Sequence, residues 1–420
     1  MSAEHADVVV VGAGPAGAST ACWLADQGLA VALLEKGEFP RDKVCGDGLT
    51  PRATKQLLRL GIDVSESNGW LHNKGLRVYG GRPEPFEIPW PTLAEFPSFG
   101  LVRKRADFDE LLADHAVAKG ATLHTKASVT GAVVDDRTGR VTGVKTKDGR
   151  TFTAPIVVAA DGNSSPTAKS VGLLKDARRP MGVACRTYFS SPRHNDEWME
   201  SWLELWDGKP GKSNLLPGYG WIFGMGDGTC NVGLGTVASS ATSAKINYRE
   251  LLQTWLANTP AEWGFTPENQ SGPIASAALP MAFNRKPAYR NGLVLVGDSG
   301  GMVSPFNGEG IPYAMEAGEA AAEAIVRAHA EGVGTPSAEK ALNGYPTRLT
   351  KEWGGYFRLG QIFVSLIEHP QVMRICTRYG LPRPALMRFT IKLLAHLYDT
   401  NDGDWMDRVI HSLSRVVPAA

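Results

Sequence analysis

The sequence has few cysteines, almost no net charge and no long apolar run, and each lack excludes a class of protein. Its five cysteines among 420 residues show no metal-ligand spacing, which indicates free thiols in a reducing compartment rather than a disulfide framework. A net charge of +1 gives no reason to expect nucleic acid as a partner. No run of about 18 apolar residues occurs, so we expect no membrane-spanning helix. The nine histidines form no metal-binding motif, and we predict no metal site.

The stretch from residue 7 to 35 carries the strongest motif. Val8–Val11 and Val31–Leu34 are short apolar runs of the kind found in buried parallel strands. Between them lies G-x-G-x-x-G, a spacing that permits a tight turn, close approach to a pyrophosphate and helix packing, with glycines at Gly12, Gly14 and Gly17. Glu35 ends the second strand, where a carboxylate can accept hydrogen bonds from ribose hydroxyls. These features together predict a dinucleotide site.

Three later segments are expected at the same sheet edge. A turn-rich loop at residues 39–49 follows the second strand and contains Cys45. A strand-like run ends at Asp161, and another ends in Gly297 and Asp298 ahead of a long helix reaching about residue 330. The Asp298 carboxylate can bind a polyol hydroxyl, and the amides of 307–311 open a helix whose positive end favours an anion.

Two further matches are rejected. Residues 297–301 spell Gly-Asp-Ser-Gly-Gly, as around the nucleophile of trypsin-like proteases, but the chain lacks a matching histidine, a disulfide framework and an all-β pattern. Residues 233–238 fit a second nucleotide pattern. They follow a hairpin strand and lack the acid at the required distance, so we treat the match as coincidence and expect one dinucleotide site.

The middle of the chain is expected to be rich in strands. Asp-Gly pairs at 148–149 and 227–228 stand between alternating segments and predict two hairpins. Residues 68–100 are rich in proline and aromatics, and the chain is expected to enter a second domain there. The tryptophans of this domain are either core residues or, taken together, the lining of a long apolar cavity; they are Trp198, Trp202, Trp206 and Trp221.

Several of these pieces together resemble a known family. The first glycine loop with Glu35, the turn at 161–162 and the pair 297–298 before a helix resemble the FAD enzymes of the para-hydroxybenzoate hydroxylase fold group. Residues 40–49, PRDKVCGDGL, resemble the P-x-x-K-x-C-G-x-G-L signature of geranylgeranyl reductases, and the hairpin from Tyr219 resembles their substrate-domain hairpin. The likeness covers nearly the whole chain and is greatest to bacterial menaquinone reductases. Gly224 stands where the family usually has proline, which bears on substrate choice.

The resemblance implies an α/β fold: a Rossmann-like FAD-binding domain with an inserted β-rich substrate domain and a C-terminal helical region. The expected limits are 1–75, 101–180 and 276–335 for the FAD-binding domain, 76–100 and 181–275 for the substrate domain, and 336–420 for the helical region. FAD is the implied cofactor, with contacts from Gly12, Ala13, Gly14, Pro15, Ala16, Gly17, Glu35, Lys36, Cys45, Gly46, Asp47, Gly48, Arg105, Ala127, Asp161, Gly162, Gly297, Asp298, Gly308, Gly310 and Ile311. The expected substrate contacts are Tyr219, Trp221 and Phe223.

The implied activity is FAD-dependent saturation of a carbon–carbon double bond in a polyprenyl chain, such as the side chain of menaquinone or a geranylgeranyl lipid. The electron donor is NAD(P)H or an electron carrier. An isolated alkene is not polarised, so its reduction needs a proton at the second carbon and a dry, apolar cavity. Cys45 is a candidate catalytic residue, as a gate or proton relay, and a structural loop thiol is the rival reading.

Two other hypotheses stay open. One is a flavin monooxygenase or halogenase of the same fold, although the chain lacks the halogenase motif W-x-W-x-I-P and has a Lys43-x-Cys45-Gly loop that hydroxylases lack. The other is a flavin-binding or lipid-carrier protein without catalysis.

A prenylated substrate resides in a bilayer, which suggests docking at the membrane surface. No signal peptide is visible, so a cytoplasmic protein at the inner face of the cell membrane is expected. Residues 384–398 could form an amphipathic helix, with a basic stripe of Arg388, Lys392 and His396 and an apolar face of Leu386, Phe389, Leu393, Leu394 and Leu397. A second apolar patch would comprise Phe357, Ile362, Phe363 and Leu366. The alternative is that both helices pack on the core.

Overall fold

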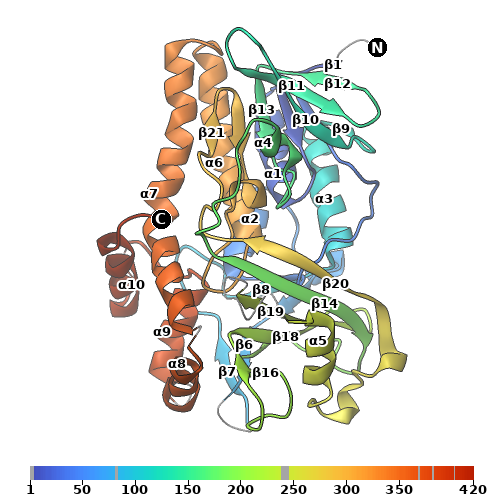
Figure 1. Cartoon of the computed structure of the whole chain (residues 1–420), viewed down its shortest axis with the longest axis vertical. Coiled ribbons are helices and arrows are strands. Elements are labelled where there is room, and N and C mark those ends of the chain that lie inside the picture. Colours follow the sequence, from blue (N-terminus) through green and yellow to red (C-terminus); the bar gives the residue numbers. More distant parts are fainter. Residues whose placement is uncertain (1–3, 81–83, 238–245, 368, 381–382, 402) are drawn as a thin grey trace.

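The structure, a computed structural model, describes residues 4–80, 84–237, 246–367, 369–380, 383–401 and 403–420. Figure 1 shows a strand-and-helix part at one end, a strand-rich part at the other, and the long helix α7 beside both. The mixed α/β architecture with C-terminal helices is the predicted fold class. The predicted domain limits stay a prediction.

The α/β part is built on a six-stranded sheet in the order β21-β22-β13-β2-β3-β9. Its pairs are parallel except β21 with β22. Alternate valines of β2 are buried in two different hydrophobic cores: Val8 and Val10 pack among the helices, whereas Val9 and Val11 face a second sheet. The strands are β2 (Val8–Val11), β3 (Val31–Leu34), β9 (Thr122–His124), β13 (Ile156–Ala159), β21 (Tyr289–Arg290) and β22 (Leu293–Leu295).

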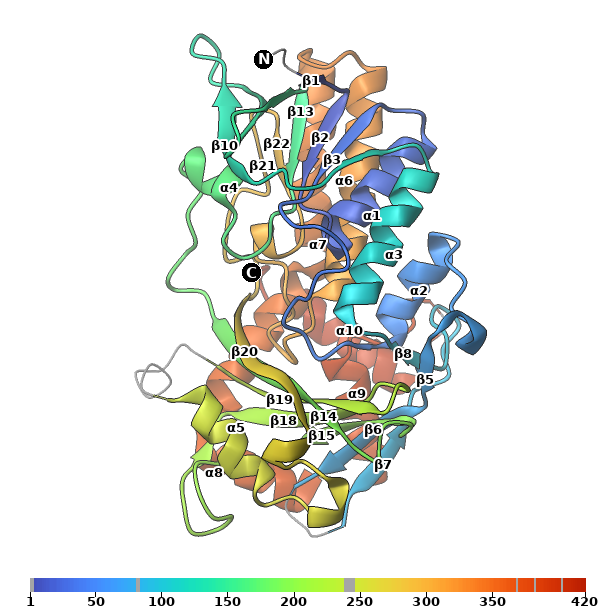
Figure 2. The ribbon, with the colours of Figure 1, turned by 90° about the vertical axis from the view of Figure 1, so that its right-hand side faces the viewer.

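Helices cover one face of this sheet and strands cover the other. Figure 2 shows α1, α3 and α6 on the same side of β2 and β3, and α1 contacts both other helices. These helices are α1 (Pro15–Asp26), α3 (Arg105–Ala118) and α6 (Ile311–Ala330). The opposite layer contains β1 (Glu4–His5), β10 (Val129–Val134), β11 (Val141–Thr146), β12 (Thr151–Thr153) and the short α4 (Pro166–Ser170). Strands β11 and β12 are antiparallel across residues 148–149, so the first predicted hairpin is confirmed.

The strand-rich part is a seven-stranded sheet in the order β20-β14-β19-β18-β15-β6-β7. Strands β18 and β19 pair from Gly218 with Thr236 to Gly224 with Cys230, which confirms the second hairpin. The strands are β6 (Gly75–Tyr79), β7 (Phe86–Pro89), β14 (Met181–Ser190), β15 (Trp198–Trp202), β18 (Gly218–Gly224), β19 (Thr229–Val237) and β20 (Gln270–Pro280). The rejected pattern at 233–238 lies mainly on antiparallel β19; its last residue, Ala238, lies outside the described residues.

The two faces of the seven-stranded sheet pack against different helices. Helix α5 (Tyr248–Leu256) covers one face, where Trp202 packs, and α9 (Pro384–Leu394) covers the other, where Trp221 is buried. The four tryptophans therefore do not line one common cavity, because side chains on a strand alternate between the two faces. That part of the sequence interpretation is wrong.

Small elements join these layers. A three-stranded sheet is formed by β4 (Gly48–Leu49), β8 (Gly100–Val102) and β5 (Leu71–Asn73), and a two-stranded one by β16 (Leu205–Trp206) and β17 (Leu215–Leu216). Helix α2 (Pro51–Arg59) follows β4 directly. Among the described residues, 3-10 turns occur at Glu66–Asn68, Ala261–Trp263, Pro267–Asn269 and Gly297–Gly300.

The C-terminal region consists of helices, as expected. They are α7 (Pro336–Ile367), α8 (Pro370–Ile375), a π-helical turn (Cys376–Gly380), α9 and α10 (Trp405–Val416). Breaks before Pro370 and Pro384 agree with the prediction, while the expected break at Pro382 lies outside the described residues. Within the part of the chain that the structure describes, the helices are all too short or too polar to cross a bilayer.

The predicted basic stripe on α9 is wrong. Lys392 is buried and its ammonium group pairs with Asp404 at 2.9 Å and Asp407 at 2.7 Å, both beside the start of α10. His396 is buried and stacks on Tyr356 with ring centroids 3.6 Å apart, and burial holds the pKa of this histidine well below its usual value. Phe357, from the second predicted patch, is fully buried as well. Sequence periodicity shows a face but not what covers it.

Candidate functional site

The glycine loop after β2 has the close packing that its spacing predicts. Gly12 has φ +98°, and a Cβ there would lie 2.5 Å from the Ala160 carbonyl oxygen at the end of β13. A Cβ on Gly17 would lie 1.8 Å from the Gly12 carbonyl oxygen, so α1 can pack on the turn only with glycine at this position. Helix α1 begins at Pro15 with Gly14 before it. The loop and the positive end of α1 form a cradle suited to a phosphate group.

The guanidinium groups of Arg41 and Arg105 lie close to this cradle. A Cβ on Gly14 would lie 3.9 Å from Nη2 of Arg41 and 4.0 Å from Nη2 of Arg105. Asp109 accepts from Nε and Nη2 of Arg105 at 2.7 and 2.8 Å and from Nη1 of Arg41 at 2.9 Å. Nε of Arg41 is buried and has no partner among the described residues. Two oriented guanidinium groups beside a helix N-terminus fit the charge of a pyrophosphate.

Glu35 lies at the end of β3, as predicted, and is buried. Its carboxylate accepts hydrogen bonds from the amides of Ala13 at 3.1 Å and Gly37 at 3.0 Å, and it pairs with Arg41 at 2.9 Å. The amide of Ala127 donates to the Glu35 carbonyl at 2.8 Å, so this distant predicted residue does lie in the same place. The side chain of Lys36, the next residue, is exposed.

Asp298 and Asp161 differ in how their carboxylates are engaged. Among the described residues, none donates a hydrogen bond to the Asp298 carboxylate. Burial raises the pKa of Asp298, against the opposing charges of Lys43, Arg105 and Lys175. Asp161, by contrast, accepts from the hydroxyl of Ser165 and the amide of Thr167, at the start of α4. Asp298 is thus the carboxylate left free for a ligand hydroxyl.

The start of α6 closes the site. A Cβ on Gly310 would lie 3.5 Å from Oδ1 of Asp298, and one on Gly297 would lie 2.9 Å from the Ala16 side chain of α1. The predicted residues of the two glycine loops therefore lie together, with Ile311 as the first residue of α6. Gly162, at φ +74°, follows Asp161 in the turn that Gly12 contacts. Gly308 is oriented toward the other sheet, because its Cβ would lie 3.3 Å from Leu279 of β20.

The loop with Cys45 is fastened to both parts of the molecule through Asp47. Its carboxylate accepts from the Arg105 amide at 3.1 Å, the Tyr188 hydroxyl at 2.6 Å and the Asn231 amide group at 2.8 Å. Arg105 opens α3, whereas Tyr188 and Asn231 stand on β14 and β19. Burial raises the pKa of Asp47 to about 6, against the lowering effect of these hydrogen bonds. Asn231 also donates to the Cys45 carbonyl at 2.9 Å.

The same loop contacts the predicted substrate side chains. A Cβ on Gly46 would lie 3.1 Å from Cε2 of Phe223 and 3.4 Å from Nε1 of Trp221. The Trp221 indole donates to Oδ1 of Asn231 at 2.9 Å, and its ring centroid lies 6.4 Å from that of Phe223. Trp221 and Phe223 belong to the apolar cluster beneath α9. The structure therefore brings the cysteine loop against one apolar face of the seven-stranded sheet.

Two groups near this junction hold protons at neutral pH. Burial raises the pKa of the Cys45 thiol, against the opposing charge of Arg105. Burial also raises the pKa of Tyr219 above its usual value, helped by the nearby Glu309 and Cys45. The Tyr219 hydroxyl donates to the Asn307 carbonyl at 2.6 Å, which ties β18 to the loop before α6.

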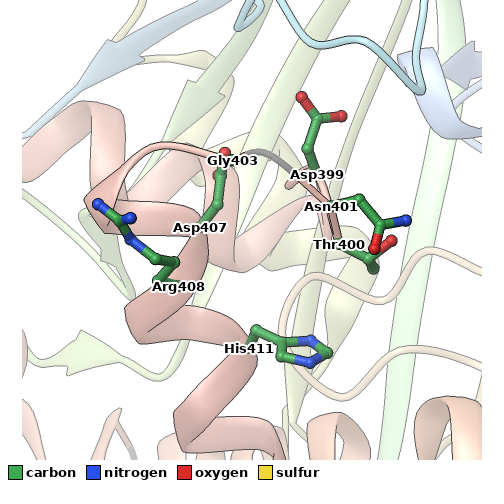
Figure 3. Close-up of a pocket in the computed structure, with 7 residues that line it drawn as sticks. All are labelled: Asp399, Thr400, Asn401, Gly403, Asp407, Arg408 and His411. Carbon is green, nitrogen blue, oxygen red and sulfur yellow. The ribbon is translucent and has the colours of Figure 1, made fainter.

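Two open pockets lie elsewhere. The pocket of about 390 Å³ in Figure 3 is lined by residues 399–401, by Gly403 and by the α10 side chains Asp407, Arg408 and His411. Figure 3 shows its side chains coming from the loop before α10 and from that helix. A larger cavity of about 1260 Å³ lies among α2, α6, α7 and α10. Neither is lined by a residue predicted to contact cofactor or substrate.

Three contributors to the site were not predicted, namely Arg41, Tyr188 and Asn231. Asn231 offered one signal, because an amide inside the run Cys-Asn-Val-Gly-Leu of a buried strand requires a specific partner. Arg41 lies in the predicted loop, but nothing in its neighbours indicates that its guanidinium reaches Glu35 and Asp109.

Comparisons with known proteins identify the family of the chain. A family model described as "FAD binding domain" matches residues 5–333. A menaquinone reductase of Mycolicibacterium smegmatis is 34% identical over 405 residues, covering 96% of this chain and 95% of that protein. A digeranylgeranylglycerophospholipid reductase of Methanosarcina acetivorans is 29% identical, covering 83% and 81%. The crystal structure of a geranylgeranyl bacteriochlorophyll reductase-like protein from Thermoplasma acidophilum has a TM-score of 0.78 at 21% identity, covering 98% and 100%.

The residues present fit FAD. The glycine cradle and the buried, unpartnered Nε of Arg41 suit its pyrophosphate, and the free carboxylate of Asp298 suits one of its hydroxyls. FAD is the cofactor of the matched family. The chain therefore belongs to the FAD-dependent oxidoreductase family with this FAD binding domain, within the group that includes the menaquinone and digeranylgeranylglycerophospholipid reductases.

Proposed function

We propose that this chain is an FAD-dependent reductase that saturates one or more double bonds of a polyprenyl chain, either the side chain of menaquinone or a geranylgeranyl lipid. The observation that carries the proposal is the junction at Asp47. There the loop beside the flavin cradle is fastened to an apolar, aromatic sheet face by Tyr188 and Asn231. The names of the relatives support the substrate class.

In this proposal FAD is held by the predicted cofactor residues. The amides at the start of α1, with Arg105 and the unpredicted Arg41, bind the pyrophosphate, because the amides of Gly12 and Ala13 already donate to Leu34 and Glu35. Glu35 binds the adenosine ribose, and Asp298 accepts from a ribityl hydroxyl. When bound and reduced, the flavin supplies a hydride. Of the amides of residues 307–311, those of Gly308 and Glu309 donate within the loop, whereas Gly310 and Ile311 lie at the positive end of α6, which favours an anion beside them.

The protein's own task is to exclude water and deliver a proton. Trp221 and Phe223 offer a buried apolar wall for a prenyl chain. An alkene carbon that receives no hydride needs a proton, and the Cys45 Sγ–H is the proposed source, because its raised pKa keeps the thiol protonated at neutral pH. The Tyr219 hydroxyl, which is bound to Asn307, is the second candidate.

Two finer points belong to the same proposal. The electron donor is NAD(P)H or a protein electron carrier, and the substrate is drawn from a membrane, so the protein works from the cytoplasm at the inner membrane surface. Domain limits at 75, 100, 180, 275 and 335 are proposed with it, separating the flavin cradle from the strand-rich substrate part.

The test is anaerobic turnover of the purified holoenzyme with a detergent-solubilised prenyl quinone and a chemical reductant. The expected product is heavier by two hydrogens for each bond reduced and contains no added oxygen. If the product instead gains one oxygen in air, the protein is a monooxygenase. A protein that binds FAD and shows no turnover with any reductant or prenyl lipid is a carrier, and either result overturns the proposal. Mass spectrometry of lipid quinones from cells lacking the protein then identifies the isoprenoid.

A further inference from the structure

The helices at the lower end of the molecule in Figure 1 carry exposed apolar side chains that no described element covers. We call five of them the tip patch; they are Ile362 (41% exposed), Leu366 (50%), Ile375 (58%), Tyr379 (52%) and Leu386 (43%). They come from the end of α7, from α8, from the π-helical turn and from the start of α9. Single exposed apolar residues are ordinary, but a group gathered on one bend of the chain indicates an interaction surface.

The same segment concentrates positive charge. The whole chain has 44 lysines and arginines against 43 acids, yet residues 358–388 contain five arginines and one glutamate. Arg378, Arg383 and Arg388 are exposed, and none of them pairs with a carboxylate among the described residues. Arg378 lies over the Tyr379 ring at 5.5 Å, and Nη1 of Arg383 donates to the Tyr379 carbonyl at 3.2 Å. The cations and the apolar side chains therefore share one surface.

Helix α10 provides an internal comparison. It exposes an apolar stripe of its own, made by Trp405, Val409, Leu413 and Val416. Its surroundings lack a positive excess, because residues 399–416 contain four aspartates and two arginines, and the one further cation, Lys392, pairs with Asp404 and Asp407 and leaves a single net negative charge. An apolar stripe beside net negative charge does not suit an anionic surface, whereas the tip patch does.

The position of the tip patch connects it to the proposed reaction. Leu386 and Arg388 of α9 are exposed, while Met387 and Ile391 of the same helix are buried in the cluster that contains Trp221 and Phe223. One side of α9 thus faces the proposed substrate wall, and the other side belongs to the tip patch. A lipid surface held at the patch would lie one helix away from that wall.

We propose that the tip patch docks the protein on an anionic phospholipid bilayer, with the arginines at the headgroups and the apolar side chains in the interface. The proposal rests on the proposed function only for the choice of a membrane-borne substrate. Surface attraction of about 1 kcal/mol for each arginine corresponds to roughly fivefold in partitioning. The apolar side chains add binding that salt does not screen.

The test is co-sedimentation of the full-length holoprotein with vesicles of phosphatidylcholine alone or mixed with phosphatidylglycerol. We expect binding to the mixed vesicles, weaker at high salt, and roughly 25-fold weaker in Arg378→Gln with Arg383→Gln. Ile375→Ser with Leu386→Ser should weaken binding roughly tenfold and leave a smaller salt-independent part. The matched controls on α10, Arg408→Gln with Arg415→Gln and Val409→Ser with Leu413→Ser, should bind as the wild type does.

Several results would overturn the docking proposal. They are wild-type protein that stays in the supernatant, equal binding to both vesicle types, or α10 variants that weaken binding as much as the tip variants. Analytical ultracentrifugation showing a dimer that the tip variants dissociate would identify the patch as a self-contact instead. FAD content and reduction of a detergent-solubilised substrate, measured in all variants, keep the two proposals separate. If no variant and not even the wild type reduces the substrate, but vesicle binding still depends on the tip patch, the proposed function is rejected and the docking proposal is retained.

Discussion

Asn231 donates from its side-chain amide to the Asp47 carboxylate at 2.8 Å, across 184 positions of sequence. The same amide nitrogen donates to the Cys45 carbonyl, and the Asn231 oxygen accepts from Trp221. One buried amide thus links the cysteine loop, the seven-stranded sheet and the indole of Trp221. Because a buried polar group left without its partners is costly, this relationship is a specific point at which the site can be broken.

Asn231→Ala removes all three hydrogen bonds at once. We expect a loss of roughly 1–3 kcal/mol in the free energy of unfolding, because the Asp47 carboxylate and the Trp221 indole lose a buried partner. Urea unfolding of the holoprotein measures it. The exposed Asn258 provides the control, since Asn258→Ala should change stability by less than about 0.5 kcal/mol. Equal effects in the two variants would contradict a linking role for Asn231.

The raised pKa of Asp47 predicts a pH dependence with a definite sign. The pKa is about 6 in the folded protein against 3.8 as the reference value, so between these values the folded state binds the extra proton. The contribution of Asp47 to the free energy of unfolding is therefore fully present below pH 3.8, and it is lost as the pH rises through 6. Relative to Asp47→Asn, the wild type should lose roughly 3 kcal/mol of unfolding free energy across that window, measured by urea titrations at several pH values. A constant difference between the two proteins would show that Asp47 is ionised throughout.

Purified protein should be yellow and contain FAD rather than FMN, because the glycine cradle and Glu35 suit the pyrophosphate and adenosine ribose that FMN lacks. Glu35→Ala should weaken FAD binding roughly ten- to hundredfold, the cost of about 1–3 kcal/mol of lost hydrogen bonds. Glu38, which is exposed and pairs with Lys126, gives the control Glu38→Ala. Recovery of stoichiometric FMN, or unchanged FAD affinity in Glu35→Ala, would reject the assignment.

Gly48→Ala tests the contact between the cysteine loop and the seven-stranded sheet. The new Cβ would lie 2.4 Å from Cε of Met199 and 3.0 Å from Cε2 of Phe223, so one of these side chains must move. We expect a loss of about 1–3 kcal/mol in unfolding free energy. Adding Met199→Ala should cost less in this background than in the wild type, because it makes room for the methyl group. Gly344→Ala, on the exposed side of α7 with no atom within 4 Å, should instead stabilise by roughly 0.5–1 kcal/mol.

Cys45→Ala separates a proton donor from a structural thiol. If Sγ holds the transferred proton, turnover should fall at least tenfold while FAD content and unfolding free energy stay near the wild-type values. The exposed Cys376 supplies the control variant Cys376→Ala, which should retain full turnover. Full activity in Cys45→Ala would show that Cys45 is not the proton donor. Tyr219 would then be the remaining candidate, and Tyr219→Phe would test it.

The parts that the sequence predicted well depend on short-range patterns. The valine run at Val8–Val11, the glycine spacing after it and the Asp-Gly hairpins are each specified within a few residues, and all have the expected conformation. Residues far apart were brought to one sheet edge by a topological rule, which is why Ala127 and Asp298 lie near the cradle.

The parts that failed depend on long-range burial. Lys392 looked like a surface cation by its spacing, yet Asp404 and Asp407 neutralise it inside the protein. Trp202 and Trp221 were grouped by composition, although they stand on opposite faces of a sheet. The partners of Asp47 lie 141 and 184 positions away, at Tyr188 and Asn231, and no local pattern encodes such a pairing.

Each of the two large sheets is built from strands that lie far apart in the sequence, and this affects folding during synthesis on the ribosome. The seven-stranded sheet pairs β6, at Gly75–Tyr79, with β15, more than a hundred residues later, and ends with β20 at Gln270–Pro280. The six-stranded sheet needs β22, at Leu293–Leu295. Neither sheet can close until about two thirds of the chain has emerged, so the nascent polypeptide carries two unfinished sheets with open edges at the same time.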